Sequence, residues 1–388
     1  MSRGFSTVKV AVLTVVAVAI AAIVMLTLFQ PLNRPSAEYG HQESQTPTIN
    51  YVIDFMGRNV TLPERVTRIV AIGPGALRLV CYLNALDLIV GVEESEITWG
   101  FTGRDYAMAY GELFRGLPVI GPGGPGKPPN PELILSVEPD LIIMSRSYAE
   151  LYNPDELEKE TKAKVVVVDY GQAGYLDVDG FAKALRMLGK ALNKSERAEE
   201  LISYVEGLVE DLRMRTERIE QRPKVYVGAV SYRGPQPFTA TQTPFPPLTL
   251  LYTRSIADGY SKGSGFLSLD FEFLLKEQPE VIFIDEGNLN IVKQDFDKDP
   301  SKYLQLNAFR EGNVYGILPY NYYHTNIAVA LADAYYIGKV LYPKSFADLD
   351  PKSKVDEIFN AFLGRPLYGA YEEAYWGFKN LAEVFKVP

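Results

Sequence analysis

One passage of this sequence occurs twice, and it constrains the fold more than any other feature. Residues 130–145 read NPELILSVEPDLIIMS, and residues 270–285 read DFEFLLKEQPEVIFID. Each copy predicts a short helix with an acidic residue in its first turn, a proline that ends the helix, and a strand that is apolar on both faces. Such strands belong inside a sheet that helices cover on both sides. Two copies this far apart predict two lobes of one architecture, with a cleft between them, rather than a solenoid of short repeats.

The sequence around each copy alternates between strand and helix patterns. In the first half, YVIDFMGRNVTLP predicts a hairpin that turns at Gly57, and RIVAIGPGALRLV predicts a strand, a turn and a helix. Further apolar strands are expected at Leu88–Val92, Leu141–Met144, Val165–Asp169, Val281–Asp285 and Val314–Leu318. The fold class is therefore α/β, with a central and largely parallel sheet in each of two similar lobes.

A long helical stretch separates the two halves. Residues 180–219 contain almost no turn signals, and after Ser195 apolar residues recur at the spacing of one face of a long helix that is expected to reach about Ile219. We expect a first lobe at 51–178, linker helices at 179–221 and a second lobe at 222–388, with residues 351–388 packing as further helices. One long helix in the linker would join the lobes stiffly.

The amino terminus predicts a membrane anchor. Residues 10–29 carry no charge, and as a helix they would span about 30 Å, the thickness of one hydrocarbon core. Arg3 and Lys9 precede them, so residues 1–9 are expected to stay cytoplasmic and the binding domain to lie on the extracytoplasmic side. The polar residues 30–50 form a flexible linker. The alternative is a cleaved signal peptide, although its apolar region would be shorter.

Composition excludes several function classes. The formal net charge is -9, and without a run of Lys or Arg the chain lacks a basic face for nucleic acid. Cys81 is the single cysteine, which rules out an intrachain disulfide and a CxxC site. With only His41 and His324, a histidine-rich metal centre is not expected, and no cofactor is predicted.

Residues 121–127, GPGGPGK, match the spacing of a phosphate loop, but the prolines remove amide donors, so we expect a surface loop.

Five motifs in a fixed order resemble a known family. They are D-x-x-G-R-x-V-x-L-P at residues 54–63, R-I-V-x-I-x-P at 68–74, L-I-V-G-V at 88–92, N-x-E-x-I-L-x-x-x-P-D-L-I-I at 130–143 and Y-x-I-G-K-x-L-Y-P at 335–343. Together they are similar to the helix-linked (class III) substrate-binding proteins of iron-siderophore and cobalamin ABC importers, over nearly all of residues 51–350. Asn84-Ala85 stands where the family usually has Leu-Gly, and the chain after Lys344 is longer than usual.

The resemblance implies a binding protein, not an enzyme, that captures a small-molecule metal chelate and delivers it to an ABC permease and its ATPase. In that family one glutamate on each lobe docks on the permease, and the matching residues are Glu132 and Glu272. The helix dipole alone would favour an acidic residue at both places. Their equivalent positions in the two copies of the repeat favour docking.

Ligand-binding residues are expected in loops at the carboxyl ends of the strands, where an α/β sheet opens into a crevice. Arginines at several of these ends, in an acidic protein, indicate an anionic ligand, because a guanidinium group binds carboxylates and oxyanions in a bidentate manner. Aromatic residues could wall a bulky chelate. The predicted ligand-binding residues are Arg78, Trp99, Arg146, Tyr232, Arg233, Tyr322 and His324.

The expected ligand is an iron(III) chelate of the siderophore class. An oxyanion such as molybdate or tungstate is an alternative, and it would use backbone amides at Gly73-Pro74-Gly75 with little aromatic wall. Haem and cobalamin are further alternatives, and His324 could ligate ferric iron or haem. A different class, a chelatase-like or metallocluster enzyme on the same fold, would need titrating His or Cys groups in the cleft.

Overall fold

The computed structural model describes residues 50–260, 263 and 265–387, and the chain from Ile49 onward forms one compact unit. The predicted anchor at residues 10–29, the residues before it and nearly all of the linker after it lie outside the described residues. Within the part of the chain that is described, no helix is both long enough and apolar enough to cross a bilayer.

The first lobe is built on a parallel sheet of strand order β4-β3-β5-β6. Its strands are β3 (Ile69–Ile72), β4 (Ile89–Gly91), β5 (Leu141–Ser145) and β6 (Lys164–Val168). Every residue of β3 and β5 is buried, as expected of strands that are apolar on both faces. The predicted hairpin, β1 (Tyr51–Ile53) and β2 (Asn59–Thr61), turns at Gly57, whose φ of 75° suits glycine. The helices are η1 (Leu86–Leu88), α2 (Ala76–Tyr82), α3 (Ser95–Thr98), α4 (Asp105–Arg115), α5 (Pro131–Ser136), α6 (Arg146–Ala149) and α7 (Pro154–Thr161).

The second lobe also has a parallel sheet, of strand order β11-β10-β7. Its strands are β7 (Val225–Gly228), β10 (Val281–Asp285) and β11 (Val314–Ile317). A separate antiparallel pair, β8 (Ala240–Thr243) and β9 (Gly265–Ser268), was not predicted, because β8 reads as a polar segment although its residues are buried. The helices are α10 (Pro246–Leu250), η2 (Ile256–Gly259), α11 (Phe271–Glu277), η3 (Glu286–Asn288), α12 (Leu289–Lys298), α13 (Pro300–Tyr303), α14 (Asn307–Arg310) and α15 (Ile327–Leu341).

The duplicated passage forms the same structure in both lobes. The first copy is α5 followed by β5, the second is α11 followed by β10, and each of these strands lies between two others in its sheet. The acidic residue before each strand has the same task. Asp140 Oδ2 accepts the Arg68 amide at 2.9 Å, and Glu280 Oε1 accepts the Lys224 amide at 2.9 Å. Both bonds fix the start of a neighbouring strand, so the repeat predicts a real structural equivalence and confirms the α/β class.

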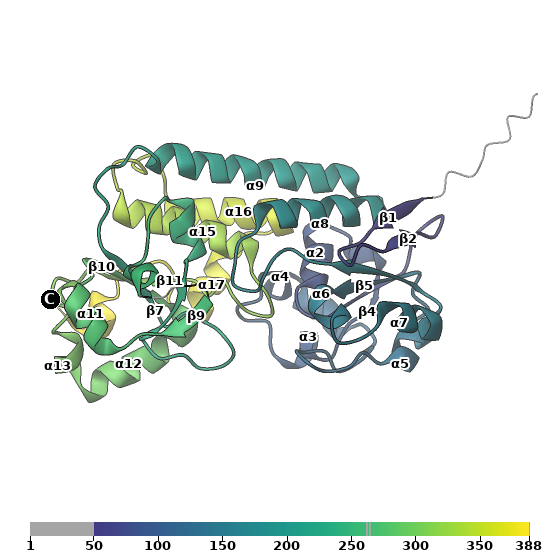
Figure 1. The fold of residues 1–388 in the computed structure, drawn as a ribbon, viewed down its shortest axis with the longest axis horizontal. Coiled ribbons are helices and arrows are strands. Elements are labelled where there is room, and N and C mark those ends of the chain that lie inside the picture. The colour runs from purple at the N-terminus through teal and green to yellow at the C-terminus, as the bar shows by residue number, and fades with distance from the viewer. Residues whose placement is uncertain (1–49, 261–262, 264, 388) are drawn as a thin grey trace, which may run out of the picture. The chain divides into compact units, whose positions relative to one another are not determined.

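The linker consists of two adjacent helices, α8 (Val178–Ala191) and α9 (Ser195–Thr216) (Figure 1). α9 is continuous over 22 residues, and besides α8 it contacts α10, α15 and α16 (Pro351–Leu363). The predicted helix reached Ile219, whereas the observed one ends at Thr216, whose buried hydroxyl donates to the Leu212 carbonyl at 2.7 Å. Because α9 is unbroken, it offers no internal hinge between the lobes.

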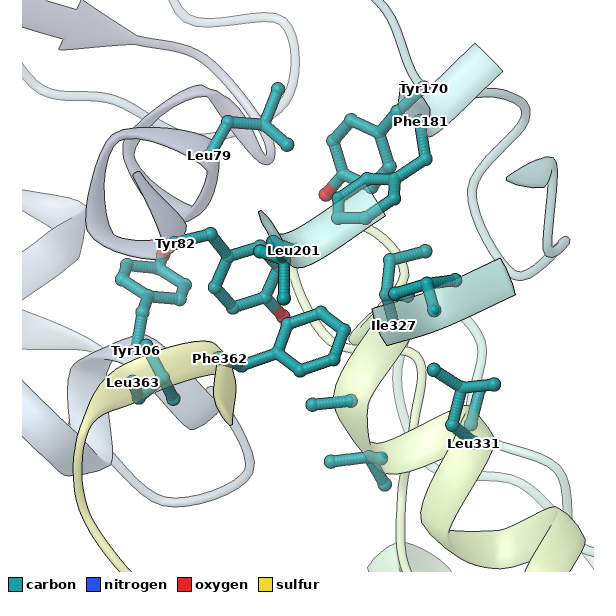
Figure 2. Packing of buried hydrophobic residues seen from close by; sticks show 14 of the residues in the cluster. Leu79, Tyr82, Tyr106, Tyr170, Phe181, Leu201, Ile327, Leu331, Phe362 and Leu363 are labelled. Carbon is teal, nitrogen blue, oxygen red and sulfur yellow. The ribbon is translucent and has the colours of Figure 1, made fainter. Parts of the chain in front are cut away.

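The carboxyl-terminal segment packs as helices, namely α16, α17 (Tyr368–Ala374) and α18 (Ala382–Phe385). α16 contacts α15 and α9 and also reaches α2 of the first lobe. Figure 2 shows the core that results, where the ring of Phe362 meets the ring of Tyr82 edge-on at 4.8 Å. One hydrophobic cluster therefore continues from the first lobe through the linker into the second.

The end of the chain also closes the second-lobe sheet. The Gly316 amide donates to the Lys379 carbonyl at 3.0 Å, and the Leu381 amide donates to the Val314 carbonyl at 2.7 Å. These bonds use backbone groups of β11, which is the outer strand of its sheet. An edge strand covered in this way is protected from pairing with another chain.

Candidate ligand-binding site

A cavity of about 920 Å³ opens at the carboxyl ends of strands from both sheets. Its walls include residues that follow β5 and β6 in the first lobe, and residues that follow β7 and β11 in the second. This is where an α/β sheet is expected to bind a ligand. Six predicted ligand residues line it: Trp99, Arg146, Tyr232, Arg233, Tyr322 and His324.

Arg78, the seventh, does not line the cavity and is fully buried. Its Nε donates to Asp105 Oδ1 at 2.9 Å, and its terminal nitrogens donate to the carbonyl oxygens of Tyr322 at 3.0 Å and Tyr323 at 3.3 Å. Another bond joins it to Tyr170 Oη at 3.0 Å. The protein itself occupies these donors, so the structure differs from the prediction of a ligand contact. The sequence could not show this, because the carbonyl partners come from the other lobe.

The two arginines that line the cavity differ in their partners. Arg146 faces two carboxylates, Glu150 at 3.2 Å and Asp169 at 3.3 Å. Arg233 lies over the ring of Tyr232, with 5.1 Å between the guanidinium carbon and the ring centre. Within residues 50–260, 263 and 265–387, no carboxylate forms an ion pair with Arg233. The positive charge available to a ligand is therefore concentrated on the second-lobe side.

The cavity wall is rich in aromatic side chains. Trp99 meets Tyr323 edge-on at 5.1 Å, and Tyr232 stacks on Phe266 at 3.9 Å. Burial raises the pKa of Tyr170 to about 12, and burial also raises the pKa of Tyr323 well above its ordinary value. Both phenols therefore stay protonated at neutral pH, where they act as hydrogen-bond donors.

His324 lines the cavity as a neutral side chain. Burial, and secondarily the nearby Arg78 charge, lower its pKa to about 3. Its Nδ1 accepts the Thr325 amide at 2.9 Å, a backbone hydrogen bond joins the ring to Gly171, and the ring lies 4.1 Å from that of Tyr170. These bonds make it a hydrogen-bonded loop histidine, and its role as an iron or haem ligand stays a hypothesis.

Buried carboxyl groups hold the strand ends that shape the cavity. In the first lobe, Glu93 Oε2 accepts the Gly73 amide at 2.9 Å and the Tyr323 hydroxyl at 3.1 Å. In the second lobe, Asp285 accepts the amides of Ser231 at 2.8 Å and Gly287 at 2.9 Å. Burial raises the pKa of Glu93 to about 8 and that of Asp285 to about 6.

The family model for periplasmic binding proteins matches residues 104–320, which is more than half of the chain. The chain belongs to the periplasmic binding protein family. Proteins of this family bind small ligands and work with the permease and ATPase of an ABC importer, so this periplasmic binding protein is a transport component and not an enzyme. The alternative of a chelatase-like or metallocluster enzyme is therefore not supported.

Relatives of this periplasmic binding protein differ in what their names say they bind. The molybdate-binding protein MolA of Haemophilus influenzae is 22% identical over 336 residues, which cover 80% of this chain and 90% of MolA. The petrobactin-binding protein YclQ of Bacillus subtilis is 20% identical over 276 residues, covering 69% of this chain and 78% of YclQ. The solved structure of the TroA-like protein FepB from Veillonella parvula superposes with a TM-score of 0.62 at 21% identity, covering 81% of this chain and 96% of FepB. At these identities the solved structure shows the fold.

The two glutamates predicted to dock on a permease lie on equivalent helices of this binding protein. Glu132 is in the first turn of α5 and Glu272 in the first turn of α11, and both are exposed. Their equivalence follows from the repeat, whereas their contact with a partner stays a prediction.

Other residues of the cavity were missed. Pro125 and Gly126 line it, although residues 121–127 read as a surface loop. Asp169 and Gln172 line it as well, directly after β6. The position of these last two at a strand end is the same signal that indicated Arg146, so they could have been predicted. The loop could not, because its approach to the cavity depends on a bond between distant residues, from the Gly124 amide to Tyr323 Oη at 3.0 Å.

Proposed function

We propose that this protein is the extracytoplasmic substrate-binding component of an ABC importer and that it captures an anionic iron(III) chelate of the siderophore class. The observation that carries the proposal is a cavity of about 920 Å³ with aromatic walls and one arginine, Arg233, that lacks a carboxylate partner among the described residues. A cavity of this size suits a bulky organic ligand. The likeness to a petrobactin-binding protein supports the same ligand class.

The contacts of the wall side chains favour a preformed complex over a bare ferric ion. The Tyr323 hydroxyl already bonds Glu93 and the Gly124 amide, and the Tyr170 hydroxyl already bonds Arg78 and the Thr325 carbonyl. The iron ligands then come from the chelator, while the protein supplies an aromatic surface and the guanidinium group of Arg233, which has no carboxylate partner among the described residues.

An oxyanion is the second candidate, since MolA carries molybdate in its name. Two observations argue against it here. The Gly73 amide, at the start of the predicted oxyanion site, already donates to Glu93 at 2.9 Å. The cavity is also far larger than a tetrahedral ion requires. Haem and cobalamin are tested directly by the measurement that follows.

A thermal-shift panel on residues 49–388, which form a compact unit, tests the proposal. The probes are a ferric tris-catecholate, ferric citrate, haem, cobalamin, molybdate and tungstate. A ligand at 100 times its Kd adds about 2.7 kcal/mol of stability. We expect a shift with the ferric tris-catecholate that Arg233→Ala reduces and that Arg146→Ala, the matched control, retains. A shift with molybdate alone would establish the oxyanion instead.

The membrane address and the docking surface belong to the same proposal. We propose that residues 10–29 stay in the mature protein as a single-pass anchor in the cell membrane, because their uncharged length matches one hydrocarbon core. Mass spectrometry of protein extracted from membranes should find the intact amino terminus, and a terminus close to Glu38 would contradict the proposed anchor.

Glu132 and Glu272 are proposed as the permease contacts, supported by their exposure on equivalent helices.

A further inference from the structure

One segment of the second lobe is hydrogen-bonded into the first lobe. Residues 320–326, here called the bridging segment, follow β11, and four of them, residues 321–324, line the cavity. Asn326 Nδ2 donates to the Gly103 carbonyl at 2.8 Å, and the Gly174 amide donates to Thr325 Oγ1 at 2.8 Å. Part of the cavity wall thus comes from second-lobe sequence but rests on first-lobe partners.

Arg78 binds the backbone of the bridging segment from the first lobe. Its guanidinium group is fully buried and is neutralised by Asp105 at 2.9 Å. Its remaining donors bond the carbonyl oxygens of Tyr322 at 3.0 Å and Tyr323 at 3.3 Å. A buried charge is tolerated only when it is paired and hydrogen-bonded. The bridging segment therefore supplies part of what keeps Arg78 stable, and moving the segment away would leave these donors without acceptors.

Glu93 binds the side chain of the same segment. The Tyr323 hydroxyl donates to Glu93 Oε2 at 3.1 Å and accepts the Gly124 amide at 3.0 Å, and both partners belong to the first lobe. The segment's backbone needs such support. Tyr323 has φ 52° and His324 has φ 86°, and side chains other than glycine seldom adopt this left-handed region. Strained conformations of this kind persist where surrounding contacts over-determine them.

We propose that Arg78 and Glu93 are positioning residues that hold the bridging segment in its cavity-lining conformation before any ligand arrives. Arg78 acts on the segment's carbonyl groups, and Glu93 acts on the hydroxyl of Tyr323. First-lobe side chains thereby hold the second-lobe wall of the cavity in place, and the binding site is formed before the ligand binds. The importance of these positioning roles for transport rests on the proposed function. The positioning roles themselves are tested on the protein without ligand.

Amide hydrogen exchange of ligand-free, full-length protein measures the effect. In Arg78→Met, amides of residues 320–326 should exchange about tenfold or more faster than in the wild type, because local opening of the segment becomes easier. Arg78→Lys, which keeps a buried donor, should recover part of the protection. The matched control is Arg58→Met, since Arg58 bonds Asp54, Asp155 and the Val165 carbonyl, all within the first lobe.

A second, milder variant keeps the proposal testable if Arg78→Met does not fold. Tyr323→Phe removes only the hydroxyl between Glu93 and the Gly124 amide, and it should also speed exchange in residues 320–326. Trp99 gives a second signal, because its ring meets that of Tyr323 at 5.1 Å and Trp376→Phe leaves it as the single tryptophan. Its emission should change in Tyr323→Ala and in Arg78→Met, and not in Arg58→Met.

The outcomes separate this proposal from the proposed function. Unchanged exchange of residues 320–326 in both Tyr323→Phe and a folded Arg78→Met would overturn the positioning roles, whatever ligand the protein binds. If no probe of the thermal-shift panel binds while the exchange results hold, the ligand class is wrong and the positioning roles stand. Equal acceleration in Arg58→Met would show a general loss of stability and would also overturn the proposal.

Discussion

Each lobe places a buried carboxyl group at a strand end, but the two groups belong to different strands and are used differently, since Glu93 follows the outer strand β4 and Asp285 ends the central strand β10. In each, the carboxyl accepts the amide of a residue that follows the lobe's first parallel strand: Gly73 for Glu93, and Ser231 for Asp285. The other acceptor bond of Asp285 stays within its own lobe, at Gly287, whereas Glu93 also accepts the Tyr323 hydroxyl from the opposite lobe. The two lobes thus share an architecture, but only the carboxyl group of the first lobe forms a hydrogen bond to the other lobe.

The charges of the cavity show the same division. The first-lobe arginine, Arg146, is offset by Asp169 and Glu150, while the second-lobe arginine, Arg233, contacts an aromatic ring instead of a carboxylate. The first lobe therefore supplies the hydrogen bonds that hold the bridging segment, and the second lobe supplies the arginine, Arg233, that has no carboxylate partner among the described residues. Mutations on the two sides should therefore differ in kind, and this can be measured.

The largest expected effect concerns the exposed glutamates, a feature in which the lobes are equivalent. Replacing Glu132 and Glu272 together with alanine should abolish stimulation of ATP hydrolysis by the reconstituted importer, because exposed charges act on association with a partner. Ligand affinity should stay unchanged, which is the control. Each single variant should lose a comparable part of the stimulation. A loss confined to one variant would show that the repeat preserved structure without preserving docking.

The next largest effect separates the two arginines. Arg233→Ala should weaken binding of the ferric tris-catecholate roughly tenfold to a hundredfold, the range for loss of a charge-assisted hydrogen bond. Arg146→Ala should change it by less than about threefold, because nearby carboxylates already offset that charge. Isothermal titration calorimetry gives both values. Equal losses would mean that a ligand displaces Asp169 and Glu150 from Arg146.

A smaller effect compares the aromatic walls. Tyr232→Ala should weaken a bulky chelate by about 1 kcal/mol, or roughly fivefold, because it removes a ring that Phe266 holds in place by stacking at 3.9 Å. Trp99→Ala, on the first-lobe side, should cost a similar amount if the ligand touches both lobes. Fluorescence or calorimetric titration measures each affinity. An oxyanion should be almost indifferent to both changes.

The two buried carboxyl groups predict different pH windows. The pKa of Glu93 is raised from 4.5 to about 8 by burial, with Glu96 adding to the rise and the Gly73 amide, Tyr323 and Tyr148 opposing it. The folded state then binds more protons than the unfolded state between these values, so this group lowers stability as pH rises from about 4.5 to 8. For Asp285 the corresponding window runs from 3.8 to about 6.

Thermal unfolding at several pH values tests this difference. Glu93→Gln should flatten the decline in stability between pH 6.5 and 8 by up to about 1.4 kcal/mol per pH unit, the maximum for one proton. Asp285→Asn should act mainly below about pH 6. Burial also raises the pKa of Glu286 to about 8, and the Asp285 charge adds to that rise, so Asp285→Asn should in addition move the Glu286 titration to lower pH, whereas Glu93→Gln should leave it in place. Identical profiles for the two variants would refute the assignment of separate windows.

The fold was predictable from sequence because its signals are local. The apolar strands at 141–145 and 281–285, and the proline before each, indicate their structure without knowledge of distant partners. The general place of the site was predictable for the same reason, since strand ends can be read from the pattern. The role of Arg78 was not, because an arginine reads alike whether it binds a ligand or the carbonyl group of a residue 245 positions away.

The smallest expected effect is the absence of a large motion between the lobes. α9 is continuous over 22 residues, α16 contacts elements of both sides, and the bridging segment joins second-lobe sequence to first-lobe partners. Each connection would have to break or bend for the lobes to separate widely, and neither α9 nor α16 offers the loop residues that absorb large dihedral changes, while first-lobe partners hold the bridging segment in place. X-ray scattering of residues 49–388 should therefore give a radius of gyration, roughly 20 Å for a compact chain of this size, that barely changes when the ferric tris-catecholate binds. The informative variant is Arg78→Met, because it weakens the bridging segment and leaves α9 intact. If compaction on binding appears only in that variant, the segment limits the motion, and if the wild type compacts strongly, neither the helix nor the segment holds the lobes.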